Sequence, residues 1–457
     1  MQVEIVVVGA GIVGLEVAWH LREAGIRRLA VIDRGAAGRG ATAHGAGLLS
    51  HFTWNPLDAH LVRRSAELYA SQQAELGGSF FRVTGSYVVV GAPTDPGAAA
   101  ASADGDGEGT RVGPRDPGQG GDAARQTTGR GSLPPTGAVG DAPRGRTAPE
   151  TEEVIRRLTS RVAMLRAAGV VVEAVDPAAG IVAVPTWNWD DIAAAWFLPH
   201  DGALLPGDGA QLLARRLRQR EVKVLEGSPV RELATGSGPG GPAVAGVRTA
   251  EGPVAADVVV VATGVWTRSL LRTAGLDAPI KPYRTQLSLW ALPEGIDPDD
   301  VPPLHDVTGA YYWLPRQGLL AVGDGTGLVE EDPDAFRRDP DPEFLEASRR
   351  RLEHRMPAAR GAEAVGGWAH LCDATPDRRP LLGPYGGVAG LHLAVGFNGF
   401  GVMRAPAVGE LVAAFVLGEE PALGGEPVAG IESLRADRFD GFVDFPIGQG
   451  FNTVDAD

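Results

Sequence analysis

Cysteine is almost absent from this 457-residue sequence, which contains only Cys372. One cysteine cannot form an intramolecular disulfide, so the sequence favours a reducing compartment. Long apolar runs are also lacking, because Arg404 and Glu410 interrupt the best candidate for a run of about 20 uncharged residues. The segment after Met1 has no basic stretch followed by an apolar leader core. We therefore expect no membrane span, no export signal and a cytoplasmic location.

Positive charge is scarce relative to negative charge. The chain has 42 Lys+Arg against 57 Asp+Glu, which gives a formal net charge of -15. These charges are spread along the chain and form no basic segment, which argues against nucleic acid or an anionic membrane as a partner. We also expect no bound metal. At 457 residues the chain is too long for one ordinary hydrophobic core, so we predict two intertwined domains.

Periodicity is lost between residues 91 and 149, where Gly, Ala, Pro, Asp, Ser and Thr dominate. Such a segment buries too little apolar surface to offset its ordering entropy, so we predict a disordered insertion. Elsewhere the apolar spacing predicts helices at residues 15–24, 56–76, 152–167, 211–220 and 405–417, and strands at 4–8, 29–32, 85–90, 222–225 and 257–262. Residues 236–242 are typical of a hairpin tip, and residues 279–328 of an antiparallel sheet.

The first expected strand ends in a glycine-rich turn. Residues 6–14 read Val-Val-Val-Gly-Ala-Gly-Ile-Val-Gly, so Gly9, Gly11 and Gly14 form a Gly-x-Gly-x-x-Gly pattern between a strand and a helix. Tight turning and close approach to a pyrophosphate require positions without side chains, and the helix N-terminus then faces the phosphates. Asp33, about 20 residues after Gly14, can accept hydrogen bonds from a ribose diol. The combination predicts a bound dinucleotide and leaves open whether it is FAD or NAD.

Three later segments decide between the two cofactors. Residues 258–266 read VVVVATGVW, residues 373–384 read DATPDRRPLLGP and residues 396–406 read GFNGFGVMRAP. Together with the glycine-rich turn, they resemble the D-amino-acid oxidase and sarcosine oxidase superfamily of FAD enzymes. The resemblance spans nearly the whole chain apart from residues 91–149, and it implies FAD as the cofactor.

The resemblance also implies a fold. It is of the α/β class, with a doubly wound, Rossmann-type FAD-binding domain interleaved with an antiparallel-sheet α+β substrate domain. The FAD-binding domain is expected at residues 1–78, 200–278 and 366–433, and the substrate domain at 79–90, 150–199 and 279–365. Residues 434–457 are expected to form a C-terminal tail.

A histidine in the first domain is placed for a covalent flavin. Residues 40–48, GATAHGAGL, resemble the segment of dimethylglycine and sarcosine dehydrogenases in which a histidine is bonded to the flavin 8α-methyl group. His44 falls on that histidine, so the resemblance implies a link that raises the reduction potential and prevents cofactor loss. Ala43 departs from those dehydrogenases, which have a tryptophan there. The alternative is that His44 only hydrogen-bonds a phosphate or the ribitol. His370 competes, because monomeric sarcosine oxidases place a flavin-bonding cysteine there, whereas Cys372 is displaced from that position.

The other expected FAD contacts surround these residues. A reduced flavin gathers negative charge near N1 and the C2 carbonyl, so backbone N–H groups at a helix start stabilise it. The glycine-rich turn at residues 396–401, ahead of the helix at 405–417, offers such groups. The full set of expected cofactor-binding residues is Gly9, Gly11, Ile12, Val13, Gly14, Asp33, Arg34, Thr42, His44, Gly45, Ala46, Gly47, Leu48, Val230, Thr263, Gly264, Trp266, His370, Gly399, Phe400, Gly401, Val402 and Met403.

The implied chemistry is oxidation of a C–N bond. In this superfamily a neutral amine gives a hydride to flavin N5, and water hydrolyses the resulting imine. Tyr312 falls on a family active-site tyrosine, and Asp324 could orient a polar group, although a strand tyrosine can equally serve in packing. Ala321 replaces a lysine that promotes the reaction with oxygen in monomeric sarcosine oxidases. We therefore expect slow use of oxygen, with an electron-transfer protein or a quinone as the acceptor.

A substrate carboxylate would need charge-assisted donors. The carboxylate-binding arginine and lysine of monomeric sarcosine oxidases correspond to His51 and Met403, and the glycine-oxidase arginine corresponds to Gly399. The remaining candidate cations are Arg404, Arg316 and Arg284, each of which could equally lie on the surface. The expected catalytic residues are Tyr312, Asp324, Arg404 and His51.

Two other functions stay open at this level. NADPH-dependent aromatic hydroxylases share the first fingerprint, although no second nucleotide motif is visible. A flavin-bearing, non-catalytic subunit of a larger complex would fit the missing carboxylate anchors. The dehydrogenases that match His44 continue into a folate-binding region, whereas this chain ends at Asp457, so we expect the imine or formaldehyde product to leave freely. The favoured interpretation is an FAD-dependent dehydrogenase or oxidase of a secondary or tertiary amine or amino acid related to sarcosine, dimethylglycine or glycine.

Overall fold

The computed structural model describes residues 1–92, 147–324 and 332–447. The insertion predicted at residues 91–149 lies almost entirely outside the described residues. At its two ends, strand β5 (Ser86–Gly91) continues to Gly91, and helix α5 (Ala148–Ala167) begins at Ala148. Within the described ranges, no helix is both long and apolar enough to cross a bilayer.

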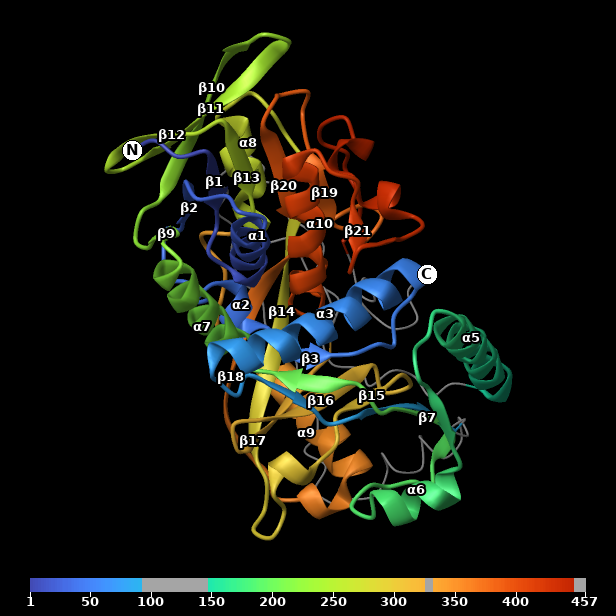
Figure 1. Ribbon diagram of the computed structural model, residues 1–457. Coiled ribbons are helices and arrows are strands. Elements are labelled where there is room, and N and C mark those ends of the chain that lie inside the picture. Colours follow the sequence, from blue (N-terminus) through green and yellow to red (C-terminus); the bar gives the residue numbers. More distant parts are fainter. Residues whose placement is uncertain (93–146, 325–331, 448–457) are drawn as a thin grey trace, which may run out of the picture.

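A six-stranded, mostly parallel sheet forms the upper half of the molecule in Figure 1. Its order is β19-β20-β13-β1-β2-β9. β19 runs antiparallel to β20, and the other four pairings are parallel. The strands are β1 (Ile5–Val8), β2 (Leu29–Ile32), β9 (Lys223–Leu225), β13 (Val258–Val261), β19 (Leu381–Pro384) and β20 (Leu391–Val395). The strands β1, β2 and β13 are continuously apolar and almost entirely buried, which is typical of a parallel sheet that is covered on both faces.

Different elements cover the two faces of this sheet. Ile5 and Val7 of β1 belong to a core shared with α1 (Ile12–Glu23), α3 (Pro56–Leu76), α7 (Pro206–Gln219) and α10 (Ala405–Leu417). Val6 and Val8 point to the opposite face, as the period of a strand requires. There they pack with α8 (Thr267–Arg272) and the small sheet of β10 (Val230–Gly238), β11 (Gly241–Thr249) and β12 (Gly252–Ala255). The Rossmann-type layer predicted from the sequence is confirmed.

Helix ends follow from local chemistry. α3 begins at Pro56 because the Asn55 side chain accepts a hydrogen bond from Asp58 N, and it ends before Gly77, which has φ 67°. The bounds of α3 and α10 are those predicted from the sequence. α7 begins five residues earlier than predicted, at Pro206, since proline suits the first turn of a helix.

An eight-stranded sheet forms the second layer, with the order β18-β14-β17-β16-β15-β5-β7-β6. Its further strands are β6 (Glu173–Val175), β7 (Ile192–Leu198), β14 (Lys281–Ala291), β15 (Leu304–Asp306), β16 (Tyr311–Arg316), β17 (Leu319–Gly323) and β18 (Glu363–Ala374). The pairings are antiparallel, as predicted, except that β15 and β5 are parallel. β18 pairs with β14 along its whole length, so residues 366–374 lie in this sheet rather than in the FAD-binding layer to which the sequence assigned them.

Helices and short strands complete this half. α9 (Pro342–Arg355) and the residues after α6 (Pro177–Ala183) pack on one face of the eight-stranded sheet, and α5 packs near the opposite face. β3 (Leu48–Leu49), β8 (Gly202–Leu204) and β4 (Phe81–Val83) form a small sheet, and β21 (Ala422–Leu423) pairs with β22 (Glu426–Pro427). The short helix α2 (Ala41–His44) follows β2 in the chain and carries His44, one of the predicted flavin-binding residues.

Candidate functional site

The turn after β1 has the shape that a dinucleotide needs. Gly9 has φ +110°, and a side chain there would collide with the carbonyl oxygen of Ala262. A side chain on Gly14 would collide with the carbonyl oxygen of Gly9, so α1 packs directly against the turn. At Gly11 the only atom near the Cβ position is Thr42 Oγ1, at 3.2 Å. The backbone therefore has room for close approach of a pyrophosphate, and these residues fit the group.

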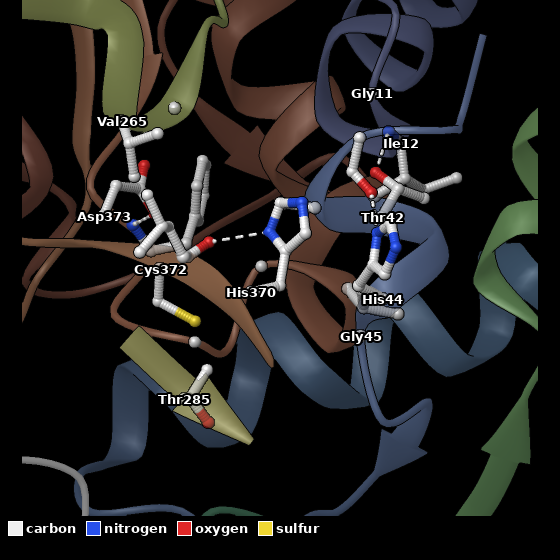
Figure 2. A pocket seen from close by; sticks show the side chains of 18 of the residues that line it. Gly11, Ile12, Thr42, His44, Gly45, Val265, Thr285, His370, Cys372 and Asp373 are labelled. Atoms are coloured by element: carbon white, nitrogen blue, oxygen red, sulfur yellow. Dashed lines mark hydrogen bonds between the residues drawn. The ribbon is translucent and has the colours of Figure 1, made fainter. Parts of the chain in front are cut away.

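Asp33 and Thr42 fix the two ends of this turn. Asp33 Oδ2 accepts a hydrogen bond from Ala10 N at 2.7 Å, and Oδ1 accepts one from Gly35 N at 2.7 Å. Thr42 Oγ1 accepts a hydrogen bond from Ile12 N at 2.9 Å, which joins α2 to the first turn of α1 (Figure 2). These contacts hold the end of β2 and the start of α1 in the geometry of a nucleotide site.

A cavity of about 730 Å³ begins at this turn and reaches the eight-stranded sheet. It has the size of a ligand or cofactor site. Three predicted site residues, Gly14, His51 and Arg404, do not line it. The predicted residues that do line it are Gly9, Gly11, Ile12, Val13, Asp33, Arg34, Thr42, His44, Gly45, Ala46, Gly47, Leu48, Val230, Thr263, Gly264, Trp266, Tyr312, Asp324, His370, Gly399, Phe400, Gly401, Val402 and Met403.

His44 and His370 lie side by side in this cavity, as Figure 2 shows. Their ring centroids are 4.3 Å apart and their planes differ by 19°. His44 Nδ1 lies 2.9 Å from Gly40 O, so in the neutral ring Nδ1 carries the hydrogen and Nε2 the lone pair. Burial, with the neighbouring His44, lowers the pKa of His370 to about 4, so His370 is neutral at pH 7. Trp368 Nε1 donates to His44 O at 2.7 Å, which brings a tryptophan against His44 although position 43 is alanine.

The glycine-rich turn ahead of α10 is hydrogen-bonded to the Asp373 side chain. Its carboxylate accepts hydrogen bonds from Gly396 N at 2.6 Å and from Phe397 N at 3.1 Å. Burial raises the pKa of Asp373 to about 6, although the two backbone N–H groups act in the opposite direction. Asn398, with φ 55°, donates to Gly396 O at 2.6 Å. These hydrogen bonds hold the first part of the turn in place, and residues 399–403, which begin within the turn, line the cavity.

One transverse row of residues on the eight-stranded sheet faces the cavity. Across the strands, Leu287 pairs with Trp368 and with Gly323, Gly323 pairs with Tyr312, and Tyr312 pairs with His305. All of these except Gly323 line the cavity. A side chain on Gly323 would collide with the Tyr312 ring, so the missing side chain lets that ring lie flat on the sheet. The antiparallel sheet therefore supplies a wall opposite the dinucleotide turn.

Two polar side chains of this wall keep their protons at neutral pH. Burial, followed by the nearby Asp324 carboxylate, raises the pKa of Tyr312, so its hydroxyl keeps its proton. Burial raises the pKa of Cys372 to about 12, so its thiol also stays protonated. His305 is a cavity residue that the sequence reasoning missed. Its only signal in the sequence is its place in the alternating stretch of residues 279–328.

The predicted cations and His51 are engaged within the protein. Arg284 donates to Arg337 O, Asp339 O and Asp341, and Arg316 donates to the carbonyls of residues 43, 45 and 46. Arg404 pairs with Asp58 at 3.0 Å. His51 Nδ1 lies 2.8 Å from Asp201 Oδ1. None of these four predicted residues forms part of the cavity wall among the described residues.

A parallel sheet with a glycine-rich turn, and an antiparallel sheet across one cavity from it, are the arrangement of a two-domain dinucleotide-binding protein. The chain belongs to the family described as FAD dependent oxidoreductase (DAO), whose model matches residues 4–415. FAD is its cofactor, and the resemblance stated from the sequence is confirmed.

The chain is similar to individual proteins in sequence and, in one case, in fold. The chain is 26% identical over 438 residues to 4-methylaminobutanoate oxidase (formaldehyde-forming) of Paenarthrobacter nicotinovorans, which covers 92% of this chain and 44% of that protein. It is 33% identical over 186 residues to glycine oxidase of Pseudomonas putida, covering 41% of this chain and 48% of that protein. The L-proline dehydrogenase structure from P. horikoshii superposes with a TM-score of 0.73 at 22% identity, covering 96% of this chain and 97% of that one. The chain spans less than half of the length of these two curated relatives.

Proposed function

We propose that this chain oxidises the C–N bond of a secondary or tertiary amine or amino acid of the sarcosine, dimethylglycine or glycine type, with FAD as the hydride acceptor. The observation that carries the proposal is a continuous cavity, which joins the dinucleotide turn at Gly9 to the polar wall at Tyr312. A substrate between the two would lie against both a cofactor and uncharged polar side chains. The names of the relatives favour the same substrates, since they include glycine, dimethylglycine and an N-methylamine.

When bound, FAD supplies a two-electron acceptor for the hydride of the carbon next to nitrogen. The chain must then bind the amine in its neutral form, orient that carbon and exclude water. Tyr312 offers a protonated hydroxyl for orientation, and Asp324 lies on the same wall. For Arg404 and His51 the proposed roles are indirect: Arg404 pairs with Asp58 at the start of α3, and His51 binds Asp201 beside the wall.

We further propose that the flavin is bonded to His44 and that oxygen is a poor acceptor. The hydrogen bond from His44 Nδ1 to Gly40 O leaves Nε2 as the nucleophilic nitrogen. His370 has a longer contact to Leu371 O, 3.3 Å, and stacks on His44. Ala321, where sarcosine oxidases have lysine, is fully buried, so the wall offers no cation there and an electron-transfer protein or a quinone is the proposed acceptor.

The test begins with purified yellow protein. Acid precipitation should leave the flavin fluorescence with the polypeptide, and anaerobic addition of sarcosine, dimethylglycine or related amines should bleach the absorbance near 450 nm, roughly where oxidised flavin absorbs. Bleaching by NADPH without any amine would favour a hydroxylase instead. Flavin that no amine reduces would contradict the proposed oxidation.

A further inference from the structure

His305 lies on β15, between β5 and β16, and β16 carries Tyr312 of the cavity wall. It pairs with Tyr312 of β16 on one side and with Val88 of β5 on the other. The His305 and Tyr312 rings meet edge to face, with centroids 5.8 Å apart. Both side chains are half-buried and line the cavity. They are therefore adjacent polar groups at the same end of the cavity.

The neighbours of His305 fix the direction of its side chain. Leu304 is buried in the core on the opposite face, with Trp313. Asp306 is two residues from Leu304 and so shares its face of the strand; Arg355 Nη2 donates to its Oδ2 at 2.9 Å, and the residue borders the end of the cavity. Because side chains alternate along a strand, these two anchors turn the imidazole of His305 toward the cavity.

The ring of His305 is free to bind a ligand. Among the described residues no hydrogen bond to this ring is found. Burial lowers the pKa of His305 to about 4, with Asp201 acting in the opposite direction. The carboxylate of Asp201 is already occupied, since it accepts hydrogen bonds from His51 N at 2.8 Å and from Ser86 Oγ at 2.5 Å. His305 is thus a neutral imidazole with one acceptor nitrogen.

The chemistry of amine oxidation determines whether a side chain beside the substrate nitrogen should donate or accept a hydrogen bond. The nitrogen lone pair must stay free to form the C=N bond, so a partner that donates a hydrogen bond to nitrogen would oppose the reaction. A partner that accepts the N–H would orient the amine and leave the lone pair available. We propose that His305 is a substrate-binding residue whose ring nitrogen accepts the N–H of the amine, next to Tyr312. This inference rests on the proposed function.

The proposal predicts a substrate preference. A neutral secondary amine has an N–H to donate to His305, whereas a neutral tertiary amine has none and leaves a buried acceptor unpaired. An unpaired buried acceptor weakens binding by about ten-fold or more. The site should therefore favour an N-methylamine over the corresponding N,N-dimethylamine by about ten-fold.

The test uses the flavin-loaded full chain and matched pairs of amines that differ by one N-methyl group, including sarcosine with dimethylglycine. Anaerobic stopped-flow bleaching gives the apparent Kd and the limiting rate for each member. His305→Gln retains an acceptor oxygen, while His305→Phe and the smaller His305→Leu remove the acceptor. His60→Gln, on the outer part of α3, is the control histidine variant. Flavin absorbance verifies that each variant is loaded.

The wild type, His60→Gln and His305→Gln should all prefer the secondary amine, and the two apolar variants should reduce the preference to less than about three-fold. Equal use of both amines by the wild type would overturn the proposal while leaving amine oxidation intact. An unchanged preference in a flavin-loaded His305→Leu variant would also overturn it. Failure of every amine to bleach the wild type is a different outcome, which overturns the proposed oxidation and this inference together.

Discussion

Arg355 joins the end of α9 to the strand that carries His305, and its removal should strongly destabilise the fold. Its side chain is 1% exposed. Nε and Nη2 donate to Asp306 Oδ2 at 3.1 and 2.9 Å, and Nη1 donates to Asp191 Oδ1 at 2.6 Å. Asp306 is itself only 3% exposed. The substitution Arg355→Ala therefore leaves a buried carboxylate without this cation.

The burial of the Arg355–Asp306 ion pair determines how much the substitution lowers the free energy of unfolding. Breaking a buried ion pair costs about 3–5 kcal/mol, whereas an exposed pair contributes about 0–1 kcal/mol. We expect Arg355→Ala to lower the free energy of unfolding by the larger amount. Arg350→Ala on the same helix is the matched control, because the side chains of Arg350 and Glu346 are 52% and 54% exposed. Arg350→Ala should lower the free energy of unfolding by less than about 0.5 kcal/mol.

The loss in Arg355→Ala should come from the buried carboxylate that remains without its partner. Urea unfolding followed by circular dichroism measures the loss, and adding Asp306→Asn should recover most of it. A deficit below about 1 kcal/mol, or one that Asp306→Asn does not reduce, would refute the reasoning.

Three further predictions concern the cavity. His44→Ala should release the flavin from acid-precipitated protein, whereas His370→Ala should retain it; the reverse pattern would assign the link to the other histidine. Thr42→Val should lower the free energy of unfolding by about 1–3 kcal/mol, because the buried N–H of Ile12 loses its acceptor, and an unchanged urea midpoint would contradict this. The pKa of Asp373 is raised from 3.8 to about 6, so its stabilising protonation is complete below pH 3.8 and lost as pH rises through 6. The free energy of unfolding of Asp373→Asn should therefore rise, relative to that of the wild type, by up to about 3 kcal/mol between pH 4 and pH 7. A difference between the two proteins that stays constant over this range would exclude the titration of Asp373.

The parts of the site that the sequence predicts are mostly local in the chain. A side chain on Gly14 would meet the carbonyl oxygen of Gly9, five positions earlier, although a side chain on Gly9 would meet the carbonyl oxygen of the distant Ala262. The limits of α3 are likewise local, since Asn55 and Gly77 cap its two ends. Motif spacing therefore indicates the nucleotide side of the cavity well.

The substrate side depends on contacts between distant residues. Arg284 and Arg316 are plausible carboxylate anchors in the sequence, but each is bound by acceptors at least 50 residues away. No periodicity contains that information. The same holds for β18, whose partner strand β14 lies about 80 residues earlier and draws residues 366–374 into the antiparallel sheet.

The short strand β15 carries both residues that stabilise the fold and His305, the proposed substrate-binding residue. Leu304 and Asp306 anchor β15 on the core face, and only that register presents the imidazole to the cavity. A shift by one residue would bury His305 and expose Asp306, because the side-chain period of a strand is two. The ion pair between Arg355 and Asp306 opposes such a shift, since it would be lost in the other register. The ion pair between Arg355 and Asp306 thus helps to determine which polar side chain faces the cavity at this strand.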